Sequence, residues 1–239
     1  ASPWPSESPL TTRPRDTGAM AYESPSYVVV ERIGPVEIRD YDGYLAAETA
    51  HVKACIPPGG RVLELGCGYG RVLKALRPSA GPLVGIDISY ASLDLARGYL
   101  AGFPDVMLAL MDAVRLAFPP ATFDLVCCIQ NGISAFRVDQ RALLAAAVDV
   151  TRPGGRVLFS SYAEAFWDHR LAWFRLQARE GLLGEIDEAA TGRGVIVCKD
   201  GFRATTVTPD QFRSLSRGLG RQATVDVVAD ASVFCEILV

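Results

Sequence analysis

The chain has 239 residues and a net charge of −3, which is enough for one large α/β domain with a buried core or at most two small domains. Its basic residues are scattered, with no run of Lys or Arg longer than two, and this argues against a nucleic-acid partner. No stretch approaches the ~20 apolar residues of a membrane span, and no secretory signal is evident. We therefore expect a cytoplasmic monomer or homodimer with no membrane partner.

The N-terminal part differs in composition from the rest. Residues 1–21 are rich in Pro, Ser and Thr and lack apolar periodicity, which predicts a flexible arm. Residues 22–239 are expected to form one domain. Its first part, residues 22–56, is expected to cover the core with two short strands within residues 27–39 and a helix over residues 44–55.

Short apolar strands then alternate with helices. The expected strands are residues 61–65, 83–87, 106–110, 124–129 and 156–161. The expected helices are residues 71–77, a helix capped by Ser89 that runs to about residue 101, and residues 140–150 capped by Asp139. This alternation predicts an α/β fold with a doubly wound, mostly parallel sheet that is covered on both faces.

The C-terminal third departs from that alternation. A long helix is predicted over residues 163–180, with Gly181 as its stop. Residues 182–207 are predicted to form an insertion hairpin, with strands near residues 184–189 and 194–206. A short helix capped by Thr208 and two strand-like runs, residues 223–229 and 232–239, complete the predicted elements.

A glycine-rich turn lies between the first strand and its helix, in the sequence VLELGCGYGR. Gly66, Gly68 and Gly70 let the backbone turn tightly and approach a ligand closely. Such a turn alone is weak evidence, because dinucleotide-binding dehydrogenases share it. Glu64, two residues before the first of these glycines, discriminates between the two classes. It would repel a pyrophosphate, whereas it would accept hydrogen bonds from the ammonium group of a sulfonium cofactor with an amino-acid tail.

Two further carboxylates follow the next strands. Asp87 lies at the carboxyl end of the second strand, where an acidic side chain can accept both hydroxyls of a ribose. Asp112 follows the third strand, where a carboxylate can accept from the exocyclic amine of adenine. Together with Glu64 they predict a nucleoside cofactor bound across the carboxyl ends of the strands.

From about residue 44 to residue 239 the chain resembles the class I S-adenosylmethionine-dependent methyltransferases. Five matches occur in the family's order: ELGCGYG, GID, MDA, FDLVCCIQ and RPGG. The resemblance implies a seven-stranded Rossmann-like sheet whose antiparallel strand is supplied by residues 232–239. It also implies S-adenosyl-L-methionine as cofactor and S-adenosyl-L-homocysteine as product. The residues it assigns to the cofactor are Glu64, Gly66, Cys67, Gly68, Gly70, Arg71, Asp87, Ile88, Asp112, Ala113 and Gln130.

The methyl acceptor is expected to be a small molecule with a nitrogen or oxygen nucleophile. The fourth strand is followed by Gln130, Asn131 and Gly132 rather than by the N/D-P-P-Y/F signature of base methyltransferases, and the double-glutamate loop of protein arginine methyltransferases is absent. Direct displacement from a sulfonium needs alignment more than elaborate chemistry. The expected catalytic residues are His169, as a general base, with Tyr41 and Tyr162. The expected acceptor-binding residues are Tyr44, Asn131, Trp167, Arg170 and Trp173.

The cysteines leave an alternative open. None of the six forms a C-x-x-C pair, so no metal site is expected, and adjacent Cys127 and Cys128 should point to opposite faces of their strand. A metalloid or thiol methyltransferase would instead use Cys127, Cys128 or Cys198. A third possibility is a non-catalytic regulatory protein that binds the cofactor.

Overall fold

The computed structural model describes the backbone of residues 39–239 and the side chains of residues 43–239. The arm expected at residues 1–21 and the strands expected at residues 27–39 therefore lie outside the described residues, except that residue 39 begins a helix. The side chain of Tyr41 is likewise outside the described part.

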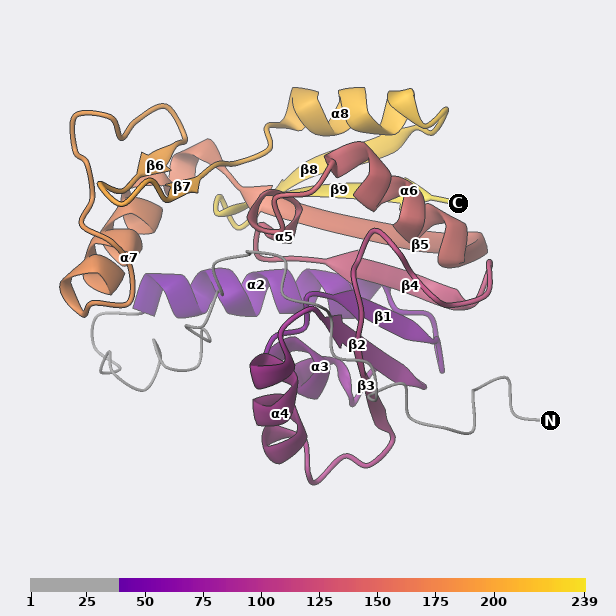
Figure 1. Cartoon of the computed structure of the whole chain (residues 1–239). Helices are drawn as coiled ribbons and strands as arrows, with labels where there is room; N and C mark the ends of the chain where they lie inside the picture. The colour runs from indigo at the N-terminus through magenta and orange to yellow at the C-terminus, as the bar shows by residue number, and fades with distance from the viewer. Residues whose placement is uncertain (1–38) are drawn as a thin grey trace.

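A seven-stranded sheet forms the centre of the molecule (Figure 1). Its order is β3-β2-β1-β4-β5-β9-β8. The strands are β1 (Val62–Leu65), β2 (Leu83–Asp87), β3 (Val106–Leu110), β4 (Phe123–Cys128), β5 (Thr151–Tyr162), β8 (Ala223–Val228) and β9 (Ser232–Leu238). The first five strands pair in parallel, and β9 is antiparallel to both β5 and β8. The predicted fold class, including the antiparallel strand, is confirmed.

Helices cover both faces of this sheet, and two apolar clusters show the layers. One face carries α2 (Arg39–Cys55), α3 (Arg71–Leu76) and α4 (Tyr90–Tyr99), whose Val52, Leu73 and Leu93 are buried against it. The other face carries α5 (Gly132–Ala135), α6 (Gln140–Val150) and α8 (Pro209–Gly218). Cys127 belongs to the first cluster and Cys128 to the second, so the adjacent thiols do point to opposite faces.

The predicted helix caps are present. The side chains of Ser89 and Asp139 accept hydrogen bonds from the backbone N–H groups of Ser92 and Ala142. Thr208 and Gln211 form a reciprocal capping box at α8, which satisfies two otherwise unpaired N–H groups.

The structure differs from the sequence expectation at the start of β5. The strand begins at Thr151, and the predicted turn of residues 152–155 lies within it. Thr151 pairs with Phe123 while Arg156 pairs with Leu125, so the strand is irregular here. Gly154 and Gly155 exchange backbone hydrogen bonds with Val239, a contact that no local pattern reveals.

The insertion hairpin is shorter than expected. It pairs β6 (Ile196–Val197) with β7 (Arg203–Ala204), and Ile186 contributes one isolated bridge, to Cys198. The segment expected as a strand at residues 184–189 turns early because the Asp187 carboxylate accepts the N–H groups of two following residues. A short 3₁₀ turn, η1 (Glu164–Phe166), leads into α7 (Trp167–Arg179).

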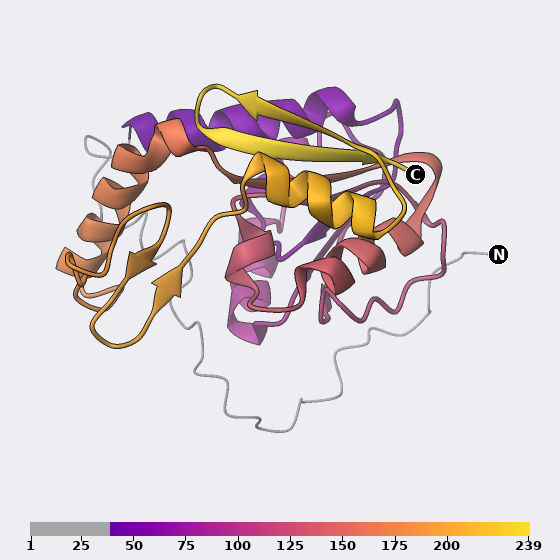
Figure 2. The same cartoon turned by 90° about the horizontal axis from the view of Figure 1, so that it is seen from above.

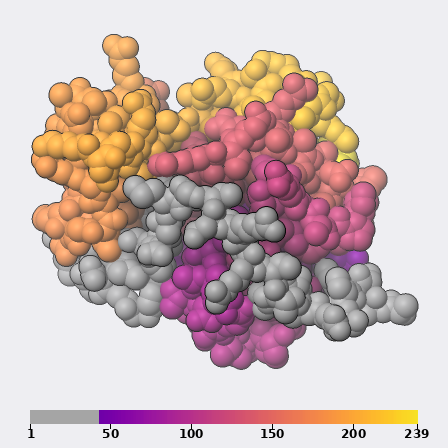
Figure 3. Space-filling view, in the orientation of Figure 1, coloured from indigo at the N-terminus to yellow at the C-terminus, as the bar shows by residue number. Residues whose placement is uncertain are grey.

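The helix α7 and the segment of residues 180–207 form a cap with a small core of its own. Ile186, Ile196 and Cys198 are buried in it, and Trp167 and Phe174 pack against them. Figure 2 shows the cap beyond the carboxyl end of β5, beside the start of α2, and Figure 3 shows it as a separate orange lobe. The cap therefore lies at the end of the sheet where the predicted cofactor residues gather.

Candidate functional site

Four chain segments meet at the carboxyl ends of the parallel strands. The glycine turn follows β1, Asp87 ends β2, Asp112 comes after β3, and Gln130 comes after β4. Because β1 lies between β2 and β4, the turn is flanked by both neighbours. The backbone N–H of Met111 donates to the carbonyl of Asp87, which joins the second and third segments.

The glycine turn has the backbone conformation that its residues permit. Gly66, Gly68 and Gly70 have φ of 71°, 53° and 89°, in the left-handed region that side chains disfavour. The N–H groups of Gly66 and Cys67 both donate to the carbonyl of Ile86, which ties the turn to β2. The side chain of Cys67 is buried in the core, so only its backbone can contact a ligand at this edge.

Asp87 is oriented by two backbone groups. Its Oδ2 accepts from the N–H of Gly68 at 2.9 Å, and its Oδ1 accepts from the N–H of Ser89 at 2.8 Å. A carboxylate can accept about four hydrogen bonds, so acceptor capacity remains on both oxygens. The side chain is half-buried and thus held at the edge of the turn.

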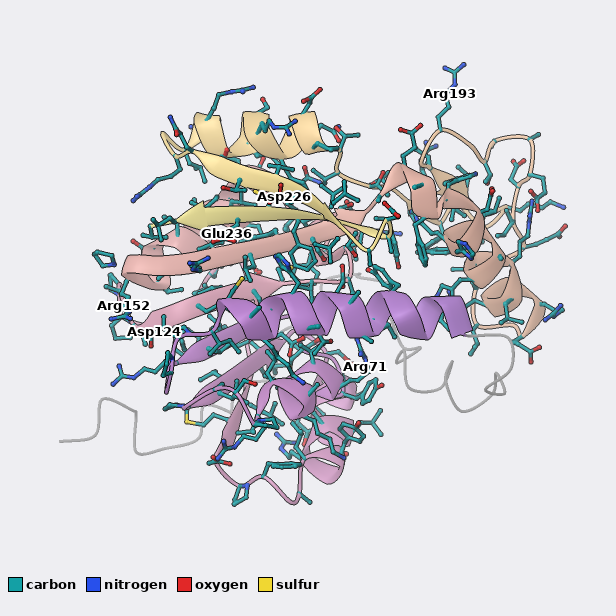
Figure 4. All side chains as sticks on the ribbon, turned by 180° about the vertical axis from the view of Figure 1, so that it is seen from behind. Arg71, Asp124, Arg152, Arg193, Asp226 and Glu236 are labelled. Atoms are coloured by element: carbon teal, nitrogen blue, oxygen red, sulfur yellow. The ribbon has the colours of Figure 1, made fainter. Side chains whose placement is uncertain are left out.

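Glu64 and Arg71 flank the glycine turn, and each has one buried side-chain atom without a hydrogen-bond partner among the described residues. In the part of the chain that the structure describes, Glu64 Oε2 and Arg71 Nη2 are buried atoms without a hydrogen-bond partner. Figure 4 shows Arg71 on the side of the sheet that α2 covers. Buried polar atoms are usually paired, so one acceptor and one donor left open beside one turn could hold a ligand with both an ammonium and a carboxylate.

Burial also changes the acidity of Glu64. Desolvation raises its pKa to about 8, and the Asp87 charge acts in the same direction. The Arg71 charge and a hydrogen bond from the Leu73 backbone act in the opposite direction but do not cancel the effect of burial. Glu64 is therefore mostly protonated at neutral pH in the free domain, and a cation placed beside it would favour its ionisation.

The residues expected to contact adenine come just after β2 and β3. Asp112 Oδ1 accepts from the N–H of Val114 at 3.0 Å, so its carboxylate is held by its own turn. Ala113 is buried beside it, whereas 72% of the Ile88 surface is exposed. An apolar side chain so exposed next to Asp87 offers a flat surface on which an aromatic ring can pack.

Glu48 is a buried carboxyl that the sequence analysis missed. It lies on α2, accepts from the N–H of Gln130 at 2.9 Å through Oε2, and accepts from the Ser232 hydroxyl at 2.8 Å through Oε1. Burial raises its pKa, against hydrogen bonds from Ser160, Ser232, the Gln130 backbone and Tyr44 that lower it. Nothing in the local pattern of α2 marks Glu48, because its partners are 82 and 184 residues away in the chain.

The contacts of Glu48 hold a strained segment. Gln130 and Asn131 have φ of 58° and 61°. Because neither residue is glycine, this left-handed conformation costs roughly 1 kcal/mol or more for each of them. Asn131 is buried; its amide oxygen accepts from the Ser161 hydroxyl at 2.7 Å and its amide nitrogen donates to the carbonyl of Thr205. Asn131, expected to bind the acceptor, thus already has protein partners on both ends of its amide.

Phe136 lies over the glycine turn. A Cβ added at Gly66 would be 2.3 Å from Cζ of Phe136, and one added at Gly132 would be 3.2 Å from the same atom. The sequence analysis explained Gly66 by the approach of a cofactor. The structure adds a protein contact, because the Phe136 ring occupies the space that a side chain at Gly66 would need.

Arg170, which the sequence predicts to bind the acceptor, is buried in the cap. It is 1% exposed, and its guanidinium donates to the carbonyls of Gly194 and Thr205. It also lies over the rings of Tyr162 and Trp167, at 4.9 and 5.8 Å. Arg170 and Trp167 therefore hold the cap together, while Trp173 is half-buried on the same helix.

An aromatic cluster joins the cap to α2. The ring of Tyr44 stacks against those of Tyr162 and Phe166, with centroids 5.1 and 5.2 Å apart. Exposed His169 stacks on Phe166 at 5.2 Å. A cavity of about 380 Å³ opens beside this cluster, and its lining includes Tyr44, His169 and Asp230. Three of the expected acceptor-site residues are thus brought together. Asn131 is linked to them through the Thr205 carbonyl, which also accepts from Arg170 beside Tyr162.

Comparison with known proteins agrees with this architecture. Residues 62–155 match the methyltransferase domain family. The ubiquinone biosynthesis O-methyltransferase of Paracidovorax citrulli is 33% identical over 106 residues, which cover 43% of this chain and 44% of the relative. The aklanonic acid methyltransferase of Streptomyces sp. strain C5 is 36% identical over 108 residues, covering 43% and 48%. The chain thus spans slightly less than half the length of these relatives.

The chain also has the same fold as several solved structures. A SAM-dependent methyltransferase from Aquifex aeolicus has a TM-score of 0.61 at 14% identity, covering 90% of this chain and 99% of that one. In sequence the chain is similar to methyltransferases over residues 62–155, and in fold it is similar to them over nearly its whole length. A protein from Pyrococcus horikoshii, with a TM-score of 0.63 at 20% identity over 89% and 97% of the two chains, shares the fold of this chain.

Replacement of Glu48 tests its contribution to the stability of the fold. Glu48→Ala leaves the Gln130 N–H and the Ser232 hydroxyl without their acceptor, so we expect the free energy of unfolding to fall by about 2–4 kcal/mol. Glu48→Gln is the matched control, since an amide can accept from Gln130 and donate to Ser232, and should cost about 1 kcal/mol or less. Urea denaturation at neutral pH measures both, and equal losses would contradict this account.

A double-mutant cycle tests the contact between Gly66 and Phe136. Gly66→Ala should lower stability because its Cβ overlaps the Phe136 ring and because its φ is positive. In a Phe136→Ala background the overlap disappears, and the same change should cost at least about 1 kcal/mol less. Urea denaturation of all four proteins gives the coupling energy, and a coupling near zero would show that the ring moves aside freely.

Proposed function

We propose that this chain transfers the methyl group of S-adenosyl-L-methionine to a small molecule with an oxygen or nitrogen nucleophile. The observation that carries the proposal is the pair of buried, unmatched groups, Glu64 Oε2 and Arg71 Nη2, beside the glycine turn. A methionine tail supplies both an ammonium for the first and a carboxylate for the second.

The chain's residues would bind the rest of the cofactor in sequence along the strand ends. Asp87 would accept from the ribose hydroxyls through the capacity that its two backbone contacts leave open. Asp112, Ala113 and Ile88 would enclose the adenine, with Ile88 against the ring face. Gln130, fixed by Glu48, would form the floor beside the sulfonium, whose positive charge makes the methyl group electrophilic.

The chemistry asked of the protein is alignment. Displacement at a methyl group needs the nucleophile, the carbon and the sulfur in line, so rigid walls matter more than a strong acid or base. The segment after β4 is held from two sides. Glu48 accepts from the backbone of Gln130, and the side chain of Asn131 bonds Ser161 and Thr205. We propose that the acceptor enters beside Tyr44, Tyr162 and His169, where the aromatic cluster and the cavity lie.

Some relatives support an oxygen acceptor, because they are O-methyltransferases of ubiquinone biosynthesis and of malonyl-[acyl-carrier protein]. A C-methyltransferase of ubiquinone and menaquinone biosynthesis is also among the relatives. The metalloid or thiol alternative is less supported, because burial raises the pKa of Cys127 and Cys128 well above the ordinary thiol value and raises that of Cys198. Burial also withholds these thiols from a substrate, which disfavours them as nucleophiles.

The pKa of Glu64 provides a direct test of cofactor binding. Glu64 is mostly protonated in the free domain at pH 7, and contact with the cofactor's ammonium should ionise it, so binding should release up to about one proton. Because the complex then holds fewer protons, affinity should rise with pH up to about pH 8. Calorimetric titrations at pH 7 in buffers of different ionisation enthalpy count the protons.

Glu64→Gln is the matched variant for this experiment. It should bind the cofactor at least about tenfold more weakly, from the loss of one charged hydrogen bond, and release no proton. Asp87→Asn should also weaken binding while leaving proton release intact. Tight binding to Glu64→Gln, or heats that do not depend on the buffer, would remove Glu64 from the cofactor site.

Variants of the aromatic cluster test the proposed acceptor site. Tyr44→Phe, Tyr162→Phe and His169→Gln should reduce turnover while changing cofactor affinity by less than about 0.5 kcal/mol, as expected for substitutions that touch no cofactor contact. Asp168→Asn, an exposed change on the same helix, is the control. Formation of S-adenosylhomocysteine with a panel of phenols, carboxylic acids and amines measures turnover. Full activity in all three variants would place the acceptor elsewhere.

A further inference from the structure

A second cluster of chemically active side chains lies further along α2, toward its C-terminal end. His51 and Cys55, one helical turn apart, face Glu236 of β9. One ligand atom of each, an imidazole nitrogen, the thiol sulfur and a carboxylate oxygen, lie within 4.8 Å of one another. All three residues are half-buried. The sequence analysis found no metal motif because the third residue is 181 positions from Cys55.

The packing of α2 against β9 brings these residues together. Glu48, His51 and Cys55 are spaced by three and four residues and share one side of the helix. Ser232, Phe234 and Glu236 alternate onto one face of β9. Glu48 bonds Ser232 and the His51 ring lies 4.2 Å from that of Phe234, so Cys55 and Glu236 form the next contact in the same series.

The charges around the cluster suit a cation. Burial lowers the pKa of His51, against the raising charges of Glu236 and Asp226, so its ring tends to be neutral with a free lone pair. Asp226 of β8 lies opposite Phe234 in the register, and Figure 4 shows it close to Glu236 on the two neighbouring strands. A second carboxylate is therefore available on the same face of the sheet.

A cation, Arg156, also lies at this cluster. It forms an ion pair with Oε1 of Glu236, which leaves Oε2 outside that pair. Burial raises the pKa of the Cys55 thiol, as does the Glu236 charge, while the Arg156 charge and a hydrogen bond from Arg156 lower it. The guanidinium would thus balance the negative charge of a thiolate and a carboxylate that share a metal ion.

We propose that His51, Cys55 and Glu236 form a site for a divalent transition-metal ion of the zinc class. One nitrogen, one sulfur and one oxygen ligand are a donor set that zinc accepts, and water or Asp226 would complete a tetrahedron. On binding, the Cys55 thiol gives its proton to solvent and its sulfur bonds the metal, with no change of oxidation state. Bonds of about 2.0–2.3 Å require the ligand atoms to draw together by roughly an ångström.

The proposed ion would fasten α2 to β9. That helix also carries Glu48 and Tyr44, so the ion would stabilise the wall of the proposed methyl-transfer site from about 10 Å away, at 1.5 Å of helix rise per residue. Its primary effect would be on folding stability rather than on the transfer step. The test therefore reads metal binding and stability directly.

The experiment uses the full chain, without a purification tag, treated with a chelator and then titrated with zinc. We expect one equivalent to bind and Tm to rise by about 5 °C at a zinc concentration a hundredfold above Kd. Cobalt in place of zinc should give the thiolate-to-metal charge-transfer band of a bound cysteine. Cys55→Ser should abolish that band and weaken zinc binding at least about tenfold, as should His51→Gln.

Cys198→Ser is the matched control, because this thiol lies in the cap, remote from the cluster. It should keep the cobalt band, the zinc affinity and the rise in Tm. Zinc binding that survives both Cys55→Ser and His51→Gln, or zinc that binds without raising Tm, would overturn the proposal. So would a cobalt complex that lacks the charge-transfer band.

Discussion

One buried carboxyl joins the parts of the chain that must meet for the site to exist. Glu48 connects the first described helix to the end of the central strand β4 and to the start of β9. Each partner needs an acceptor, because Ser232 is buried and Gln130 is half-buried, and an unpaired buried donor costs about 1–3 kcal/mol. The position of α2, the conformation after β4 and the docking of β9 are therefore mutually dependent.

The same contact explains why the strand end tolerates strain. Two consecutive residues that are not glycine, Gln130 and Asn131, adopt left-handed conformations, which are unfavourable in an unconstrained loop. Glu48 holds the first through its backbone, and Ser161 and Thr205 hold the second through its side chain. Strain of this kind persists where the surroundings over-determine it, and here it fixes the direction in which the chain leaves the sheet beside the glycine turn.

Local pattern was enough to predict the alternating core. Short apolar runs bounded by glycine, proline and capping residues gave the strands β1 to β4 and the caps Ser89, Asp139 and Thr208, because each signal is contained within a few residues. The carboxylates Glu64, Asp87 and Asp112 were predicted to gather at one edge because topology alone places the carboxyl ends of parallel strands together.

What the sequence did not reveal depends on contacts between distant segments. The residues before Arg156 look like a simple turn, yet Gly154 and Gly155 pair with Val239. The burial of Arg170 was not predicted either, because the backbone carbonyls and aromatic rings that enclose it come from several segments. Glu48 and Glu236 gave no local signal, because their partners lie on elements that only the folded chain brings near.

The place of β9 in the sheet has a consequence for synthesis. This strand lies between β5 and β8 and carries the partner of Glu48, so neither the edge strand nor the helix α2 can dock fully until residues 232–238 have left the ribosome. The nascent chain would meanwhile expose the open side of β5 and the polar groups of Glu48 and Gln130. Unpaired strand edges favour association with other chains. The late-emerging segment is thus the one whose delay or loss would most endanger the yield of native protein.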